Sequence, residues 1–330
     1  MLGQSCEKTG DETHSSRRNL KSHIASSFQL EHFPRLVRGR NGKAQLLQNS
    51  FRLAHLLGAK LTDSLKQQFI VENRTGASGI IGTDYVAKSA PDGYTFVFIF
   101  DTHSVHQALT PKLPFDPIKD FAPVMLVGTA PMAITTAAGK PYKSFADVLA
   151  AAKANPDKLT IGNVGNGSLG HLATILLNQA AGIQLVPVPY KGGGPLSTDV
   201  MGGQIDFAMA STAAQAQHVR GGKMRALVLT GDKRSHTMPE VPTLAELGVS
   251  WQGAYAFWGI LAPAATPKPI IDKLVAELNK AIKQPDVQKT LTETLGMDVL
   301  ALSPEATGKL IGDAIQRWGK VVKDNNITAQ

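Results

Sequence analysis

The sequence predicts an α/β protein whose strands form parallel sheets. Short apolar segments alternate with segments of helical period along most of the 330 residues. Glycine turns join a strand to the following helix at two places, over 75–79 and over 165–170. Strands that alternate with helices in this way are typical of a parallel sheet covered by helices. A chain of this length has room for two lobes, each with its own core.

The regular alternation starts at about Leu53. Apolar residues at helical spacing predict helices, short apolar runs predict strands, and Pro91-Asp-Gly93 predicts a turn. In chain order we expect a helix over 53–65, a strand over 69–72, a helix ending at 90, a strand over 94–100, a helix over 144–154, a strand that starts at 159, a helix after 168, strands over 184–190, 204–210 and 225–230, and a helix over 271–282. Ser303 followed by Pro304 starts the last helix well, because Ser caps free N–H groups and Pro suits the first turn.

Composition excludes several kinds of site. The single cysteine, Cys6, excludes an internal disulfide and a cysteine-rich metal site. His103 and His106 are the only close pair of histidines, and without further ligands nearby they predict no metal site. No apolar run approaches 18 residues, so we expect no transmembrane helix. We expect no metal and no cofactor.

The net charge of +8 does not indicate a nucleic-acid-binding protein. Residues 1–50 hold eight Lys or Arg and four Asp or Glu, so half of the net charge lies in that short segment. The remaining chain is nearly balanced and has few aromatic residues on which bases could stack. We therefore expect no nucleic-acid partner.

The stretch from Leu159 to His171 is the strongest functional signal. An apolar strand leads through a glycine turn into an amphipathic helix that Gly182 can end. The first N–H groups of a helix are unpaired and lie at the positive end of its dipole, so they attract anions. Glycines let an anion approach the backbone, and a hydroxyl adds a donor. The candidate site residues here are Gly165, Asn166, Gly167, Ser168 and His171.

The residues of this turn leave four interpretations open. Gly165, Gly167 and Gly170 match a dinucleotide fingerprint, but the strand over 184–190 is followed by Lys191 and three glycines, without the acidic residue that would bind a ribose. Ser168 could be the nucleophile of a hydrolase, followed by Asp206 and His218 in the required order, although position 166 departs from that motif. Carboxylate or phosphate capture is the third interpretation, and a plain connecting turn is the fourth.

Seven ordered motifs carry a family resemblance. They are Val71-Glu-Asn-Arg-Thr-Gly-Ala-Ser-Gly79, Ala90-Pro-Asp-Gly-Tyr-Thr95, Leu113-Pro-Phe-Asp-Pro-Ile-Lys-Asp-Phe-Ala-Pro-Val124, Val188-Pro-Tyr-Lys-Gly-Gly-Gly-Pro195, Gly202-Gly-Gln-Ile-Asp-Phe207, Lys233-Arg-Ser235 with Pro239-Glu-Val-Pro-Thr243, and Trp258-Gly-Ile-Leu-Ala-Pro-Ala264. From about Leu53 to its C-terminus, the chain resembles the Bug family, the TctC-like substrate-binding receptors of tripartite tricarboxylate transporters.

The resemblance implies a type II periplasmic binding protein, with two Rossmann-like lobes joined by two crossing strands. Residues 53–132 plus 252–330 would form lobe 1, and residues 133–251 lobe 2. Such a protein is a monomeric, non-catalytic, periplasmic receptor that closes on a small organic carboxylate, which would be a di- or tricarboxylate, an aromatic acid or an acidic amino acid. Its further partner would be a membrane transporter pair or a sensor.

The resemblance also adds candidate ligand-binding residues. In the family, backbone amides and small hydroxyls of loops at the cleft hold the carboxylates. On this basis we expect contributions from Thr102 and Ser104 in lobe 1, and from Tyr190, Lys191 and Gly192 in lobe 2. Asp206 is a further candidate, because it would bind an amino group if the solute were an amino acid.

Residues 1–52 depart from the family pattern. Members have a cleaved signal peptide, a first strand and a carboxylate-binding loop of the form P-F-P-P-G-G, and this segment shows none of them. We therefore expect residues 1–52 to be disordered or read in a shifted frame, lobe 1 to lack a central strand, and export and binding to be impaired. A serine hydrolase using Ser168 and a non-functional, N-terminally altered receptor are the alternative functions.

Overall fold

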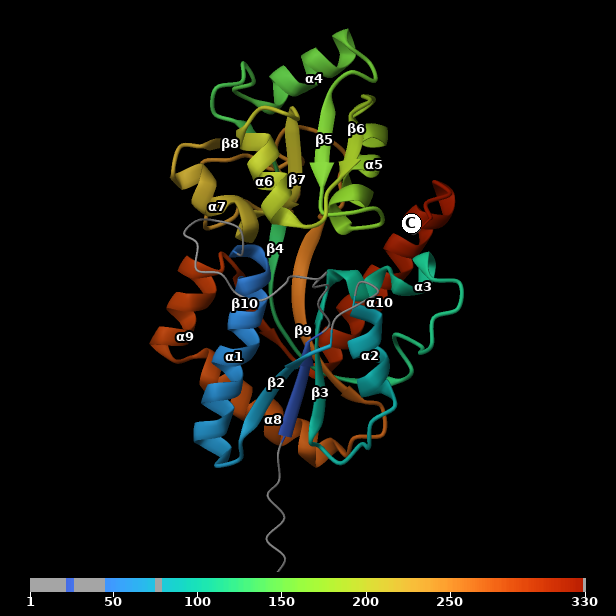
Figure 1. Cartoon of the computed structure of the whole chain (residues 1–330), viewed down its shortest axis with the longest axis vertical. Coiled ribbons are helices and arrows are strands. Elements are labelled where there is room, and N and C mark those ends of the chain that lie inside the picture. The colour runs from blue at the N-terminus through green and yellow to red at the C-terminus, as the bar shows by residue number, and fades with distance from the viewer. Residues whose placement is uncertain (1–21, 27–44, 75–78, 329–330) are drawn as a thin grey trace, which may run out of the picture.

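Two β-sheets share one long strand in the computed structural model, which describes residues 22–26, 45–74 and 79–328. The sheets form two lobes, one above the other in Figure 1. The first lobe, at the bottom, has the strand order β2-β1-β3-β9-β4, and β10 also pairs with β4. The second lobe, at the top, has the order β4-β7-β5-β6, and β8 also pairs with β4.

The strands have the following bounds: β1 Ser22–Ser26, β2 Phe69–Asn73, β3 Thr95–Phe100, β4 Phe121–Ala137, β5 Thr160–Asn163, β6 Val186–Pro189, β7 Phe207–Ser211, β8 Met224–Leu229, β9 Tyr255–Pro263 and β10 Asp298–Leu302. The helices are α1 Gln45–Leu65, α2 Ile80–Ala87, α3 His106–Leu109, α4 Phe145–Ala154, α5 Leu169–Ala181, α6 Gly193–Met201, α7 Thr212–Arg220, α8 Lys268–Ile282, α9 Pro285–Lys289 and α10 Pro304–Asp324. Two short helical turns complete the set, η2 Asp101–Ser104 and η3 Thr290–Thr294.

Strands β4 and β9 connect the two lobes and make the sheets mixed rather than purely parallel. Strand β4 carries the chain from the first lobe to the second, and β9 carries it back, so the two pair antiparallel, from Phe121 with Pro263 to Pro131 with Tyr255. Within each lobe the other neighbours keep the expected direction, since β1 is parallel to β2 and β3, and β5 is parallel to β6 and β7. The expected two-lobed α/β fold with two crossing strands is confirmed.

The expectation that lobe 1 lacks a central strand is wrong. Ser22–Ser26 forms β1, which lies between β2 and β3 and pairs in parallel with both. An extended segment can complete a sheet through backbone hydrogen bonds alone, so the family's sequence pattern is not needed for pairing. The first helix also begins at Gln45 rather than at Leu53. The expected disorder over the rest of this segment, residues 1–21 and 27–44, lies outside the described residues.

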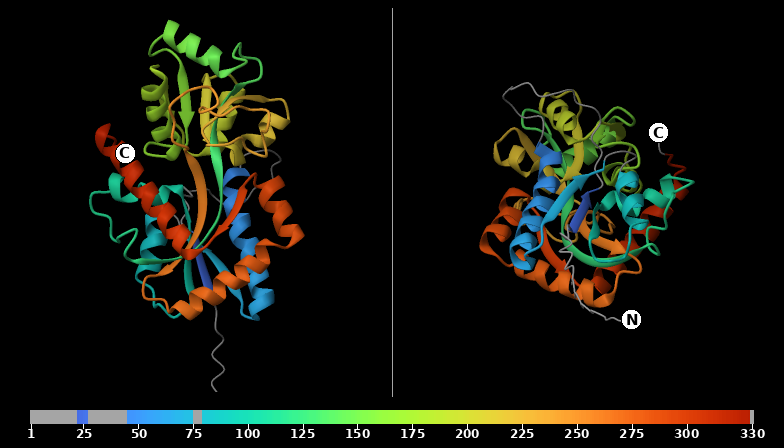
Figure 2. Two further views of the ribbon diagram at one scale, coloured as in Figure 1. Left: turned by 180° about the vertical axis from the view of Figure 1, so that it is seen from behind. Right: turned by 60° about the horizontal axis from the view of Figure 1, so that its bottom comes forward.

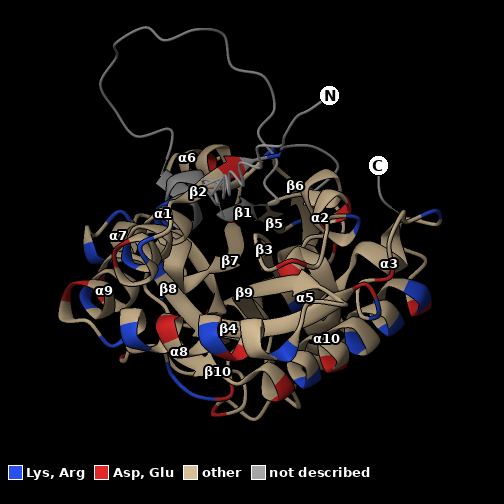
Figure 3. Ribbon diagram, turned by 90° about the horizontal axis from the view of Figure 1, so that it is seen from below, with Lys and Arg blue, Asp and Glu red and all other residues tan. Residues whose placement is uncertain are grey.

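Local signals placed most other elements correctly. Ser144 caps α4 in a reciprocal arrangement with Asp147, Ser303 caps α10, and Gly182 ends α5 in the left-handed conformation. The outward side of α8 and α10 carries acidic and basic residues in mixture (Figure 3), including the i,i+4 pairs Lys268–Asp272 and Lys309–Asp313. None of the helices among the described residues is long and apolar enough to span a membrane.

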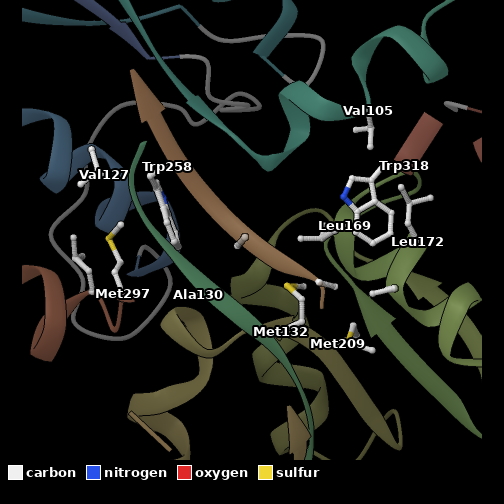
Figure 4. Packing of buried hydrophobic residues seen from close by; sticks show 14 of the residues in the cluster. Val105, Val127, Ala130, Met132, Leu169, Leu172, Met209, Trp258, Met297 and Trp318 are labelled. Atoms are coloured by element: carbon white, nitrogen blue, oxygen red, sulfur yellow. The ribbon is translucent and has the colours of Figure 1, made fainter. Parts of the chain in front are cut away.

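The hydrophobic core continues through the junction of the two lobes. One cluster of buried side chains contains residues of α1 and α8 in the first lobe and of β5 and α5 in the second. Helix α10 starts beside β4 and runs toward the second lobe, as the left view of Figure 2 shows. Its Trp318 belongs to the same cluster as Val105, Leu169 and Leu172 (Figure 4), so α10 packs against both lobes.

Candidate functional site

The candidate site lies where the second lobe's parallel strands end at the junction. Strand β5 ends at Asn163, and its arrow points toward the first lobe in Figure 1. Because β6 and β7 run parallel to β5, all three carboxyl ends lie along one sheet edge. Ligands of open α/β sheets bind at this edge. The turn from Gly165 to His171 follows β5 directly.

Glycine is required for the shape of this turn. Gly165 and Gly167 have φ angles of 130° and 71°, which residues with a Cβ rarely adopt. The N–H of Gly165 donates to Oδ1 of Asn163 over 3.0 Å, and the N–H of Ser168 donates to the carbonyl of Gly165 over 3.1 Å. The turn is therefore held in one conformation by its own hydrogen bonds.

The ring of His171 is committed to the same turn. Nδ1 accepts the N–H of Gly167 over 3.0 Å, and because a backbone N–H can only donate, the ring proton must lie on Nε2. Burial lowers the pKa of His171 below its ordinary value, which favours the neutral ring. His171 is thus a neutral side chain with an N–H at Nε2.

Ser168 is the N-cap of α5. Its Oγ accepts the N–H of His171 over 3.3 Å and lies 3.5 Å from Oδ1 of Asn163. The next two residues, Leu169 and Gly170, occupy the first two helical positions, where a helix offers no carbonyl to their N–H groups. No acidic side chain lies in this first turn. The start of α5 is therefore suited to an anion.

The segment after β6 lies beside this turn. The N–H of Tyr190 donates to the carbonyl of Asn163 over 2.9 Å, which joins the two segments. The hydroxyl of Tyr190 donates to Asp199 over 3.0 Å. The pKa of Tyr190 is raised to about 12, mainly because the side chain is buried and in addition because the carboxylate of Asp199 lies beside it. Gly192 precedes α6, with a φ of 93°, and Lys191 is exposed. A second helix start thus lies next to the first.

The first lobe contributes η2 and α3, which follow β3. Thr102 is half-buried, and Ser104 is buried with its hydroxyl donating to the carbonyl of Asp101 over 2.5 Å. Burial raises the pKa of the Asp101 carboxyl to about 7, against the opposing effect of the Thr102 N–H. Ser104 therefore stabilises its own turn, whereas Thr102 and Asp101 add polar groups at the end of β3.

The two halves of the site meet at Gly167. A Cβ at this position would overlap Cδ1 of Leu109, which is the last residue of α3 in the first lobe. Figure 4 shows Val105, which precedes α3, and Leu169 of α5 beside Trp318. The turn after β5 and the segment after β3 are therefore neighbours, although about 60 residues separate them in the sequence.

Asp206 lies away from the other predicted residues. One carboxylate oxygen accepts Nζ of Lys140 over 2.9 Å, and the other accepts the N–H and hydroxyl of Thr160. Thr160 begins β5, so Asp206 lies at the opposite end of that strand from Asn163. These contacts join the start of β5 to the residue before β7.

The structure argues against the hydrolase interpretation. The hydrogen-bond partners of the Ser168 hydroxyl among the described residues are Asn163 and the N–H of His171, and neither is a base. Nδ1 of His171 accepts from Gly167, and the chain-order partner Asp206 bonds Lys140. A serine nucleophile requires a base within hydrogen-bond reach, and the described residues do not bring one to Ser168.

Sequence reasoning missed Asn163. It ends β5 with its side chain fully buried, accepts from Gly165 and lies against Ser168, while its Nδ2 has no hydrogen-bond partner among the described residues. A polar residue at the end of an apolar strand and next to a glycine turn was the available signal.

The described part of the chain holds no group of three His, Cys, Asp or Glu side chains that could bind a metal ion.

Comparison with known proteins identifies the family. Residues 53–327 match the model of the tripartite tricarboxylate transporter family receptor, TctC. The chain belongs to the TctC receptor family. Protein BugT of Bordetella pertussis is 35% identical over 274 residues, which cover 82% of this chain and 84% of BugT. A Pseudomonas protein, described as the UPF0065 protein in the tcbD-tcbE intergenic region, is 34% identical over 278 residues, covering 84% of this chain and 82% of that protein.

Solved structures agree with this assignment. The R. palustris protein Rpa4515 with adipate has a TM-score of 0.79 and 28% identity, over 94% of this chain and 98% of that one. The structure of MatC from Rhodopseudomonas palustris with bound malate has a TM-score of 0.75 and 29% identity, over 92% of this chain and 99% of that one. The structure of the periplasmic binding protein BugD has a TM-score of 0.76. As a TctC-family member, the chain has the fold of periplasmic solute-binding receptors, which are not enzymes.

Proposed function

We propose that this TctC-family receptor captures a small organic carboxylate between its two lobes, at the start of α5. The observation that carries the proposal is the start of that helix. The N–H groups of Leu169 and Gly170 lack helical acceptors, glycines precede them, and the neutral ring of His171 keeps an N–H at Nε2. Donors held in place before binding are suited to an anion, because little ordering remains to be done.

The remaining predicted residues surround this anion site in the proposal. Asn166, Ser168 and the segment from Tyr190 to Gly192 line it in the second lobe, and Thr102 approaches it from the first, on a turn that Ser104 stabilises. Solved relatives with adipate and with malate support a carboxylate as the solute class. We exclude Asp206 from the proposed site, because its carboxylate is bonded to Lys140 and Thr160.

The proposal includes an arrangement of lobes and a cellular location. Residues 53–132 plus 252–330 form the first lobe, which β1 completes, and residues 133–251 form the second. The receptor acts in the periplasm as a monomer and delivers its solute to a membrane transporter pair or a sensor. Membership of a family of periplasmic receptors supports this location.

A titration of the purified chain tests the proposal. The probes are malate, adipate, citrate, benzoate and glutamate, with the uncharged diamide of adipic acid as control. At least one carboxylate should stabilise the protein increasingly with its concentration, by about 2.7 kcal/mol at a hundred times its Kd. The neutral diamide should not. The proposal fails if no carboxylate changes the melting temperature or gives heat in calorimetry.

A pair of histidine variants locates the binding site. His171→Ala should weaken binding of the best carboxylate about tenfold or more, because one hydrogen bond to a charged group is lost. His218→Ala is the matched control, since His218 lies in the last turn of α7, at the helix end away from β7. Equal affinities of the two variants would place the anion elsewhere. Covalent labelling of Ser168 by a fluorophosphonate would instead support the hydrolase alternative.

A further inference from the structure

Asn163 connects the two segments that form the proposed anion site. Its Oδ1 accepts the N–H of Gly165 over 3.0 Å, and its backbone carbonyl accepts the N–H of Tyr190 over 2.9 Å. One residue therefore sets the position of both the turn before α5 and the segment before α6. Its side chain is 0% exposed.

The orientation of the Asn163 amide follows from these contacts. The N–H of Gly165 can only donate, so the oxygen of the side-chain amide must be the atom that faces it. The Ser168 hydroxyl donates to the same oxygen over 3.5 Å. The nitrogen Nδ2, with two N–H donors, is therefore directed away from these two partners.

Those two donors have no acceptor among the described residues. Nδ2 is buried and has no hydrogen-bond partner there. Buried polar groups in folded proteins are nearly always paired, and an unpaired one is a reason to look for a missing partner. Asn178, near the other end of α5, illustrates the usual case, because both its nitrogen and its oxygen are bonded to the backbone of Leu185.

We infer that Asn163 is a specificity-determining residue of this site, holding both loops through its oxygens and donating from Nδ2 to a carboxylate oxygen of the bound solute. This inference rests on the proposed function. Two observations point to the same place: the N–H groups of Leu169 and Gly170, which have no helical acceptor at the start of the 13-residue helix α5, and the buried amide next to them, which is unpaired among the described residues. An amide that donates to the solute favours an anion without adding a charge of its own.

The Asn163→Asp variant is the decisive test. It keeps the size of the side chain and an oxygen for Gly165, but it replaces the donor by a second oxygen and adds a negative charge. Binding of malate or adipate should weaken about a hundredfold, because a charge-assisted hydrogen bond is lost and repulsion is added. Asn178→Asp, in helix α5, is the matched control. It should lower the melting temperature and leave the Kd within about threefold.

A direct measurement separates donation to the solute from a purely structural role. In protein labelled with ¹⁵N-asparagine, the side-chain NH₂ signal of Asn163 is identified by its loss in Asn163→Asp. This signal should shift on addition of the carboxylate, whereas that of Asn178 should stay in place. An unchanged signal, or an Asn163→Asp variant that binds within threefold of the wild type, overturns the inference.

The outcomes also distinguish this inference from the proposed function. If the wild type binds none of the five carboxylates, the proposed function and the inference fall together. If the wild type binds and the Asn163 tests fail, the receptor function stands and the inference alone is wrong. If Asn163→Asp does not fold, the NH₂ shift is measured on wild-type protein, with the signal assigned by triple-resonance spectroscopy.

Discussion

At the scale of single residues, Gly167 combines two requirements that sequence reasoning could only partly foresee. Its φ of 71° follows from the turn, but the contact with Leu109 comes from the other lobe. Glycine is therefore needed at this position both for the backbone conformation and for the approach of α3. The two effects can be separated with Gly182, which follows the other end of helix α5. Gly182 has a similar φ of 61° but open space around it.

We predict that Gly167→Val destabilises the protein more than Gly182→Val does. Both substitutions place a β-branched residue in the left-handed region, which costs about 1–3 kcal/mol. Only the valine at 167 must also displace Leu109, which adds about 1–3 kcal/mol of overpacking and should abolish carboxylate binding. Urea unfolding and calorimetric titration of the two variants measure the difference. Equal stability and equal affinity would contradict the described contact between the lobes.

At the scale of elements, the contacts of Asp206 tie the start of β5 to β7 and to Lys140. Burial opposes ionisation of this carboxyl, but the N–H of Thr160 and the ammonium of Lys140 outweigh it, so the pKa of Asp206 lies below its ordinary value. A carboxyl with a lowered pKa in the folded state stabilises the protein above its unfolded pKa of about 3.9. That contribution is lost as the pH falls through the lower, folded value.

We predict that Asp206→Asn lowers the free energy of unfolding by about 1–3 kcal/mol at pH 7. The difference from the wild type should begin to shrink as the pH falls below about 4, where the carboxyl of the unfolded chain takes up its proton, and it should vanish as the pH falls through the lower pKa of the folded state. Denaturant unfolding at pH 7 and near pH 3 measures it. Carboxylate affinity should stay unchanged, since Asp206 lies at the end of β5 opposite to Asn163. A large loss of affinity would return Asp206 to the binding site.

At the scale of the whole molecule, α10 couples the two lobes. Trp318 is 4% exposed and belongs to a cluster that contains Val105 of the first lobe and Leu169 of the second (Figure 4). Arg317, the preceding residue, donates to the carbonyls of Gln252 and Gly253, just before β9 enters the first lobe. Helix α10 therefore supports both a connecting strand and the start of α5.

We predict that Trp318→Ala costs about 3–5 kcal/mol of stability, as truncations of large buried side chains do. Carboxylate affinity should fall too, because α5 loses the contact that positions its first turn. Lys320→Ala is the control on the same helix, since its pair with Asp324 is exposed and should contribute at most about 1 kcal/mol. Thermal unfolding followed by circular dichroism measures stability. A Trp318→Ala protein as stable as Lys320→Ala would show that the junction does not depend on this helix.

The sequence alone determined the features that depend on neighbouring residues. Helical spacing and caps located α4, α5, α8 and α10, and the glycine turn after β5 indicated an anion site, because these signals act over a few positions. Family motifs then supplied the two-lobed fold and the receptor class. The residues at the start of α5 could thus be predicted from the sequence.

Only the tertiary structure decided which distant residues meet. It placed Leu109 against Gly167, put Asp206 at the end of β5 opposite to Asn163, and used Ser22–Ser26 as a central strand. It also directed the oxygens of Asn163 to two loops and left its nitrogen unpaired among the described residues. Such contacts depend on how whole sheets and helices pack, and a sequence pattern of period 2 or 3.6 does not encode them.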